Sequence, residues 1–359
     1  MNLRILFFIN SEVGGAEKMS VFISKMLIRH GIKPGYVIVK DKLTAASITD
    51  FLPKGQWVEI IEAKNNIEKV LYFWRLIQKK KPDVVFSSHL SINDKLLLLK
   101  PFFTKVRFVI RSDNYYSTYR ILSKLFIKIT YRFADIMITQ NEEMKDEFIL
   151  HNIMSPAHII TLENPVDKEM IDTKLRNAKN PYPKDGKMHI VAVGRFSHQK
   201  GYDYLAKSFA IVRPEYKNCE LYIIGGHTGR WQPEFDRFIS LVKELGIEKD
   251  VHCMGYQSNP YKYIKYADCF VLSSRWEGLP NVLAESLYLR TPVAAFKCIP
   301  IIERMVRDGI DGHLAEKEDV TGLSSAIMKA IELGRTNPVY AGSNEQDFVE
   351  LFVKHKITE

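Results

Sequence analysis

The stretch DCFVLSSRWEGLPNVLAESLYLR occupies residues 268–290. Its first part, residues 268–273, is a short apolar run that is typical of a buried β-strand. A loop with turn residues follows, and apolar residues then recur at helical spacing over residues 281–290. Strand, loop and helix in this order are the repeating unit of a doubly wound α/β protein.

The same alternation continues along the whole chain of 359 residues. In the first half we predict strands at residues 3–9, 36–39, 57–61, 83–87, 107–110, 135–139 and 158–162, and helices at 15–30, 66–81, 92–99, 116–133 and 142–151. In the second half we predict strands at 189–193, 220–224, 251–254, 268–273 and 293–296, and helices near 202–212, 234–245, 281–290 and 321–332. Residues 164–186 lose this periodicity and collect proline and asparagine, as linkers do.

We therefore predict an α/β fold with two facing Rossmann-like domains, residues 1–165 and 187–335, and a linker at 166–186. Ligands of open α/β sheets bind beyond the carboxyl ends of the strands, so the site is expected in strand-exit loops along an interdomain cleft. Residues 336–359 contain a helical pattern that is either a solvated terminal helix or one that crosses back to the first domain.

The formal net charge of +9 lies entirely in the first half. Residues 1–180 carry 28 basic and 19 acidic side chains, whereas residues 181–359 carry 23 of each. This asymmetry favours an anionic partner for the first domain only, such as a nucleic acid or an acidic membrane surface, although solubility alone is an open explanation. Arg120, Lys124, Lys128 and Arg132 recur every fourth residue beside an apolar face, which indicates either a membrane-docking helix or an ordinary helix with solvated charges.

Two strand exits carry groups suited to an anion. Gly14 and Gly15 precede a helix and allow close backbone approach, although a tight turn is the commoner reason for paired glycines. Arg195 and Lys200 lie five residues apart between a strand and a helix, where they could hold a diphosphate from two sides or be two solvated charges.

A third exit contains two carboxylates, Glu277 and Glu285, separated by a Gly-Leu-Pro turn. Glu285 falls near an apolar helical face, where a carboxylate is costly unless a partner satisfies it. A phosphate at the helix N-terminus near residues 279–281, with a sugar hydroxyl on each carboxylate, would meet this condition. Structural salt bridges are the alternative for each glutamate alone.

Three motifs together resemble retaining glycosyltransferase family four, of the bacterial surface-polysaccharide type: Gly-Gly-Ala-Glu at 14–17, Val-Gly-Arg-Phe-x-x-x-Lys-Gly at 193–201 and Glu-Gly-Leu-Pro-x-x-x-x-Glu at 277–285. The resemblance runs in order from residue 3 to about residue 331. It implies the GT-B fold, in which two Rossmann-like domains face each other and a C-terminal helix crosses back.

The resemblance also implies the roles of the donor-site residues. Arg195 and Lys200 would hold the nucleotide diphosphate, Glu285 the ribose hydroxyls and Glu277 the donor sugar, with the nucleobase against the loop at 254–256. The expected donor-binding residues are Gly14, Gly15, Gly194, Arg195, Lys200, Gly255, Tyr256, Glu277, Gly278, Leu279, Pro280, Asn281 and Glu285.

The catalytic partner on the first domain departs from the family pattern. Where the family often has a histidine, this chain has Arg-Ser-Asp-Asn at 111–114, similar to the Ser-acidic-Arg/Asn variants of some members. The expected catalytic residues are Glu277, Arg195, Lys200, Asp113 and, from the preceding strand exit, His89. A lone histidine such as His89 is more often structural.

The sequence contains no Asp-x-Asp triplet. We therefore expect neither a metal nor another cofactor, with Arg195, Lys200 and helix N-termini balancing the charge of the diphosphate.

Together with these features, the resemblance implies a retaining, metal-independent glycosyltransferase (hexosyltransferase). It would move a hexose or N-acetylhexosamine from a nucleotide-diphosphate sugar, with a UDP-sugar preferred over GDP-mannose, to a glycan or lipid-linked acceptor in lipopolysaccharide or capsule biosynthesis. An epimerase or phosphorylase on the same fold remains an alternative, since fold does not fix reaction. A nucleic-acid-binding protein is a weaker one, because no nucleic-acid-binding motif is recognisable.

The expected location is the cytoplasm. The chain has no apolar run long enough for a transmembrane helix or a signal peptide. We expect peripheral attachment to the inner face of the cytoplasmic membrane through Arg120, Lys124, Lys128 and Arg132.

Overall fold

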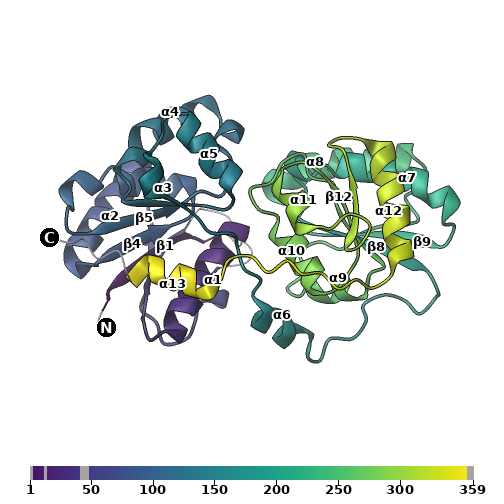
Figure 1. Cartoon of the computed structure of the whole chain (residues 1–359), viewed down its shortest axis with the longest axis horizontal. Helices are drawn as coiled ribbons and strands as arrows, with labels where there is room; N and C mark the ends of the chain where they lie inside the picture. Colours follow the sequence, from purple (N-terminus) through teal and green to yellow (C-terminus); the bar gives the residue numbers. More distant parts are fainter. Residues whose placement is uncertain (1–2, 12–13, 41–47, 354–359) are drawn as a thin grey trace. The chain divides into compact units, whose positions relative to one another are not determined.

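A computed structural model describes residues 3–11, 14–40 and 48–353 of the chain (Figure 1). The chain divides into two compact units. Unit 1 comprises residues 1–165 and 342–359, and unit 2 comprises residues 166–341. Each unit is built on one parallel β-sheet with helices on both faces.

The sheet of unit 1 has seven strands in the order β3-β2-β1-β4-β5-β6-β7. The strands are β1 Ile5–Asn10, β2 Gly35–Lys40, β3 Val58–Glu62, β4 Val84–Ser87, β5 Arg107–Arg111, β6 Ile136–Thr139 and β7 Ile159–Thr161. The helices are α1 Gly15–Arg29, α2 Asn66–Lys80, α3 Leu90–Leu97, α4 Ile121–Thr130, α5 Glu142–Leu150 and α13 Glu345–Val353. Asn65 and Asn141 cap α2 and α5 by accepting backbone N–H bonds at 2.9 and 2.8 Å.

Helices cover both faces of this sheet, so its central strands β1, β4 and β5 are buried and largely apolar. All six residues of β1 are buried, as expected of a parallel strand between two helical layers. Phe8 points into the core formed with α2, α3, α4 and α5, whereas Phe7 points into the core formed with α1 and α13. This alternation is the two-residue period of a strand.

Helix α13 packs against α1, although more than 300 residues separate them in the sequence (Figure 1). Phe348 and Phe352 are buried in the unit 1 core, and the Phe352 ring lies 5.5 Å from that of Phe86 between centroids. Arg29 pairs with Glu345 at 2.6 Å. The core on the α1 face of the unit 1 sheet is therefore completed by residues that follow unit 2 in the sequence.

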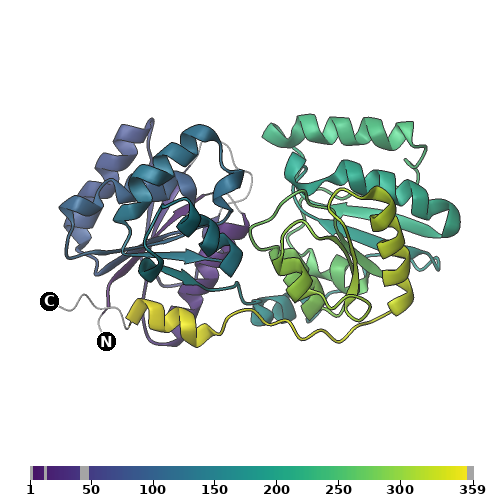
Figure 2. The ribbon, with the colours of Figure 1, turned by 45° about the horizontal axis from the view of Figure 1, so that its top comes forward.

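The sheet of unit 2 has six strands in the order β10-β9-β8-β11-β12-β13. Figure 2 shows the ribbon of this unit, green to yellow, turned by 45° from the view of Figure 1. The strands are β8 Met188–Val193, β9 Cys219–Ile224, β10 Val251–Cys253, β11 Cys269–Leu272, β12 Val293–Phe296 and β13 Gly312–Ala315. The helices are α6 Lys168–Leu175, α7 Tyr202–Glu215, α8 Gln232–Glu244, α9 Tyr261–Tyr266, α10 Asn281–Tyr288, α11 Ile301–Met305 and α12 Val320–Leu333. Helices α7, α8 and α12 share one core with the sheet.

Several segments differ from the sequence prediction. The predicted linker at 166–186 contains helix α6, which the side chain of Asp167 caps by accepting a 3.0 Å bond from Met170 N. The predicted helix at 116–133 is broken, because Tyr119 and Arg120 are extended and α4 begins only at Ile121. The four-residue strand β13 was not predicted, since Gly-His-Leu-Ala carries no β-branched or repeated apolar pattern.

Candidate active site

Two loops meet at the carboxyl edge of the unit 2 sheet, because β8 and β11 are neighbours in it. The β8 loop covers residues 194–201 and the β11 loop covers residues 273–280. Gly201 adopts a left-handed φ of +61°, and a Cβ there would lie 2.1 Å from the carbonyl oxygen of Ser273. Glycine at this position therefore permits backbone-to-backbone contact between the two loops.

Lys200 and Glu277, predicted separately, form one ion pair across these loops. Lys200 Nζ lies 2.7 Å from Glu277 Oε1, and Ser274 Oγ donates to the same oxygen at 2.6 Å. Glu277 is only 7% exposed. The structure thus brings together the residues expected to contact the diphosphate and the sugar.

Arg195 lies apart from this pair. It is exposed, and its guanidinium carbon stands 5.0 Å from the ring centroid of Trp231, a cation–π contact. Gly194 leaves room for the lysine instead, since a Cβ there would lie 2.8 Å from Lys200 Cε. The two cations five residues apart do not converge on one point here.

Glu285 sits in the second turn of α10, which begins at Asn281 after the buried residues Gly278, Leu279 and Pro280. Tyr261 of α9 donates its hydroxyl proton to Glu285 Oε1 at 3.3 Å. Burial and the charge of Glu285 raise the pKa of Tyr261, so this hydroxyl remains a donor at neutral pH.

The predicted nucleobase loop lies beside the β8 loop. Gly255 has a φ of +64°, and its carbonyl accepts a 2.9 Å bond from the N–H of Gly225. A Cβ on Gly225 would lie 1.8 Å from the carbonyl oxygen of Gly194. Gly225 was not identified from the sequence as a residue of this site, although the Gly-Gly pair directly after β9 indicates a close backbone approach. Tyr256, next to Gly255, is 51% exposed.

The carboxyl edge of the unit 1 sheet holds the remaining predicted residues. Gly14 and Gly15 lead into α1, and the carbonyl of Ala16 in its first turn accepts a 3.2 Å bond from Ser88 Oγ. His89, the next residue, precedes α3 and its Nδ1 lies 2.8 Å from Ser91 Oγ. The predicted glycine loop and the predicted histidine therefore lie on neighbouring strand exits.

Asp113 follows β5 at the same edge and accepts a 3.0 Å bond from the hydroxyl of Tyr119. Beneath it, Arg111 is 1% exposed and donates to the side-chain oxygen of Asn164. Burial lowers the pKa of Arg111 to about 10, against the opposing effect of Asp113. The buried network also contains Asn93 and Gln140, which bond the carbonyls of Arg111 and Ser112. Sequence reasoning did not identify it.

Helix α4 exposes its apolar face. Ile127 and Thr130 are buried against the unit. The outward side carries Ile121, Leu122, Leu125, Phe126 and Ile129, each between 44% and 85% exposed. Arg120, Lys128 and Arg132 are exposed and Lys124 is half-buried. We call these outward apolar and basic residues the α4 surface. In the described part of the chain, no helix combines the length and the apolar character needed to cross a membrane.

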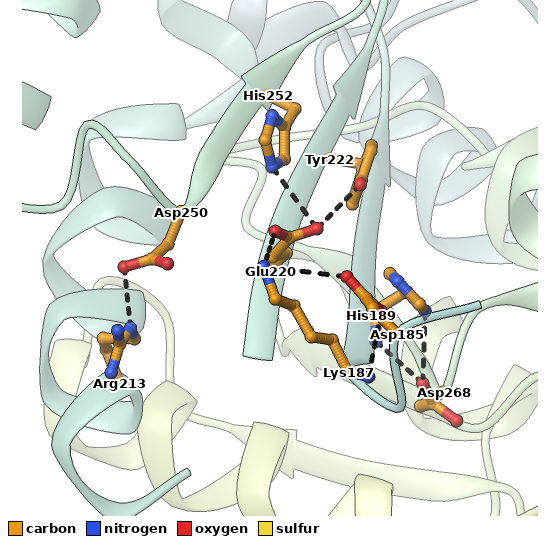
Figure 3. Close-up of polar contacts among 9 residues, drawn as sticks. All are labelled: Asp185, Lys187, His189, Arg213, Glu220, Tyr222, Asp250, His252 and Asp268. Atoms are coloured by element: carbon orange, nitrogen blue, oxygen red, sulfur yellow. Dashed lines mark hydrogen bonds and ion pairs between the residues drawn. The ribbon is translucent and has the colours of Figure 1, made fainter. Parts of the chain in front are cut away.

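A separate polar cluster lies at the opposite, amino edge of the unit 2 sheet (Figure 3). The buried carboxylate of Glu220 lies 2.5 Å from Lys187 Nζ and 3.4 Å from His252 Nε2, and accepts a 2.8 Å bond from Tyr222. Burial opposes its ionisation, but Lys187, Tyr222 and His252 together lower the pKa of Glu220 to about 2. These residues lie away from the strand-exit loops described above.

Residues 174–345 match the family model of the glycosyl transferases group 1. An uncharacterized glycosyltransferase of Methanocaldococcus jannaschii is 31% identical over 240 residues, which cover 62% of this chain and 58% of that relative. The N-acetylgalactosamine-N,N'-diacetylbacillosaminyl-diphospho-undecaprenol 4-alpha-N-acetylgalactosaminyltransferase of Campylobacter jejuni is 28% identical over 220 residues, or 61% of this chain and 57% of that relative. The chain thus matches less than two thirds of the length of these two relatives.

Among solved structures, Anabaena HepE in complex with UDP and glucose superimposes with a TM-score of 0.76 at 16% identity. The superposition covers 99% of this chain and 97% of HepE. This likeness supports the GT-B fold predicted from the motifs. With two parallel-sheet α/β units, the chain has the GT-B fold, and its residues 174–345, just under half of its length, match the glycosyl transferases group 1.

Proposed function

We propose that this chain is a retaining, metal-independent glycosyltransferase of surface-polysaccharide assembly. Its donor, a nucleotide-diphosphate sugar, binds at the carboxyl edge of the unit 2 sheet. The observation that carries the proposal is the Lys200–Glu277 pair, held at 2.7 Å by loops from two adjacent strands. A half-buried cation and a buried carboxylate at a strand exit are the complementary groups that a diphosphate and a sugar hydroxyl require.

In this proposal, the ammonium group of Lys200 also contacts the diphosphate and stabilises its negative charge as it leaves. Glu277, held by Ser274 at 2.6 Å, accepts a hydroxyl of the donor sugar. Glu285 accepts the ribose hydroxyls, with the Tyr261 hydroxyl bonded to one of its oxygens. Arg195 reaches the diphosphate by leaving the ring of Trp231. Asp113 of unit 1 contacts the acceptor hydroxyl.

The comparisons support the choice of donor and acceptor classes. The HepE structure was solved in complex with UDP and glucose, which favours a UDP-sugar. The Campylobacter relative is named for transfer of N-acetylgalactosamine to a diphospho-undecaprenol-linked sugar, which favours an N-acetylhexosamine and a lipid-linked glycan acceptor. Relatives named for capsule and lipopolysaccharide biosynthesis point to the same kind of pathway.

A lipid-linked acceptor would be reached at a membrane surface, and the α4 surface suits this location. Each cation near an anionic leaflet contributes on the order of 1 kcal/mol, and burying an exposed leucine or phenylalanine contributes about 1.5–3 kcal/mol. Outward apolar side chains next to Lys128, Arg120 and Arg132 fit an anionic bilayer better than a nucleic acid. A bilayer can bury the apolar side chains in its interior, whereas the surface of a nucleic acid is mostly charged and polar. We therefore propose a peripheral protein of the inner face of the cytoplasmic membrane.

The test combines binding with product analysis. We expect UDP to bind more tightly than GDP or ADP by isothermal titration, and a UDP-sugar to be consumed with a lipid-linked acceptor, giving a product of unchanged anomeric configuration by NMR. Glu277→Gln and Lys200→Met should each reduce turnover at least about a hundredfold. Lys243→Met and Glu244→Gln, on the exposed face of α8, serve as charge-matched controls.

Turnover of both variants within a factor of two of the parent would refute the assignment. Rapid conversion of the free donor without any acceptor would instead identify an epimerase. Retention of full turnover after chelation of divalent metals is expected, and its loss would refute metal independence.

A further inference from the structure

The guanidinium of Arg275 connects the two loops of the proposed donor site, the β11 loop and the β8 loop. In the sequence, Arg275 lies between Ser274 and Glu277 in the β11 loop. The hydrogen-bond partners of its side chain lie in the β8 loop and in the first turn of α7. Arg275 Nη1 donates to the carbonyl of His198 at 2.8 Å, and Nη1 and Nη2 donate to the two carboxylate oxygens of Asp203 at 2.9 and 2.6 Å. Asp203 stands in the first turn of α7, directly after the β8 loop.

Backbone and amide bonds continue the same junction. The N–H of Arg275 donates to Gln199 O at 2.8 Å, and Ser273 Oγ donates to Lys200 O at 2.9 Å. Gln199 Nε2 returns a 2.9 Å bond to the carbonyl of Trp276. Gln199 and Lys200 are thus bonded across the junction to the residues that precede Glu277.

Arg275 is well suited to fix the relative orientation of the loops. Its side chain is 12% exposed, and its guanidinium carbon lies 4.3 Å from the ring centroid of Tyr204. A planar fork that binds both oxygens of one carboxylate defines an angle as well as a distance, which a lysine cannot do. Burial disfavours the ionised form of Asp203, but the hydrogen bonds and charge of Arg275 outweigh it and lower the Asp203 pKa.

We propose that Arg275 and Asp203 are positioning residues that set the distance and angle between Lys200 and Glu277 for donor binding. The inference rests on the proposed function of Lys200 and Glu277 and goes beyond it, since that proposal assigns no role to Arg275 or Asp203. A displacement of about 1 Å between groups that act on one ligand can cost up to about a hundredfold in rate. Loss of the fork is therefore expected to act through geometry while Lys200 and Glu277 remain present.

The experiment compares four single variants in the full chain. Arg275→Met and Asp203→Asn should weaken UDP binding and lower kcat/KM by about 10- to 100-fold. Arg275→Lys, which keeps the charge without the fork, should lie between these variants and the parent. The matched control is Arg213→Met, because Arg213 pairs with Asp250 at 2.7 Å in the same unit but at the amino end of the strands. It should keep the parent affinity for UDP.

A double-mutant cycle separates positioning from stability. If Arg275 acts through Glu277, then Arg275→Met should lower kcat/KM by a much smaller factor in the Glu277→Gln background than in the parent. Circular dichroism and thermal unfolding identify the temperatures at which each variant is folded, and Arg275→Lys provides a second variant if Arg275→Met does not fold.

Four results are decisive. Parent affinity for UDP in folded Arg275→Met, or fully additive losses in the cycle, would overturn the positioning role while leaving the donor site intact. An equal loss of UDP affinity in Arg213→Met would also overturn it, by indicating a general effect of stability. A parent that binds none of UDP, GDP and ADP would refute the proposed function and this inference with it.

Discussion

Replacing Glu220 by glutamine should destabilise unit 2 at neutral pH and much less in acid. Glu220 is 5% exposed, and its carboxylate is held by Lys187, Tyr222 and His252 (Figure 3). These contacts lower its pKa from 4.5 to about 2. One pKa unit corresponds to about 1.4 kcal/mol, so the ionised carboxylate contributes about 3 kcal/mol to the free energy of unfolding.

The sign of the pH dependence follows from the lowered pKa. The contribution is present above pH 4.5, where the unfolded carboxyl is also ionised, and it is lost as the pH falls toward 2. For a unit of this size, about 3 kcal/mol corresponds to about 6–12 °C in the unfolding midpoint. Glu220→Gln should therefore unfold about 6–12 °C below the parent at pH 7.5, and this difference should shrink between pH 4.5 and pH 3.

Differential scanning calorimetry in the presence and absence of UDP measures these midpoints. Glu244→Gln, which removes an exposed carboxylate from α8, is the control and should unfold within about 1 °C of the parent. The reasoning is refuted if Glu220→Gln unfolds within 2 °C of the parent at pH 7.5, or if their difference is the same at pH 7.5 and pH 3.

Three further predictions concern the proposed activity. Lys128→Glu combined with Arg132→Glu should lower the fraction of protein that sediments with vesicles of 30% phosphatidylglycerol at least about tenfold, with unchanged UDP affinity; equal sedimentation would refute docking through the α4 surface. Gly201→Ala should weaken UDP binding, because its Cβ would meet the Ser273 carbonyl at 2.1 Å, and parent-like titration curves would contradict this. Asp113→Asn should lower kcat at least about tenfold with little change in donor affinity, whereas an unchanged kcat would exclude Asp113 from the acceptor side.

The sequence predicted most of the strands and the donor loops because both depend on local patterns. Apolar runs flanked by turn residues identified the strands that form the centre of each sheet, and the spacing of Glu277 and Glu285 singled out the β11 loop. The pairing of Lys200 with Glu277 was not predictable in this way. They are 77 residues apart, and only the adjacency of β8 and β11 brings them together.

Tertiary packing also determined which helix faces are buried and which distant residues are in contact, and sequence periodicity could not predict either. The pattern around Lys124 and Lys128 indicated an amphipathic helix, but the two faces of α4 could not be assigned from it. In the structure Ile127 packs inward, while Leu122 and Phe126 point out. The Arg111–Asn164 contact was not predictable for a similar reason, since the two residues are 53 positions apart, at the end of β5 and after β7. Arg275 was seen only as a neighbour of Glu277, and nothing in the motif revealed Asp203 as its partner.

The position of α13 has a consequence for how this chain is made and divided. Phe348 and Phe352 complete the unit 1 core, yet a ribosome synthesises them after all of unit 2. Unit 1 can therefore reach its final packing only after residues 342–353 have emerged, and until then the surface around Phe7 and Phe86 has to be shielded in another way. An expression fragment that stops at Pro165 would keep this surface open, so a separable N-terminal unit would need the α13 segment attached through a linker.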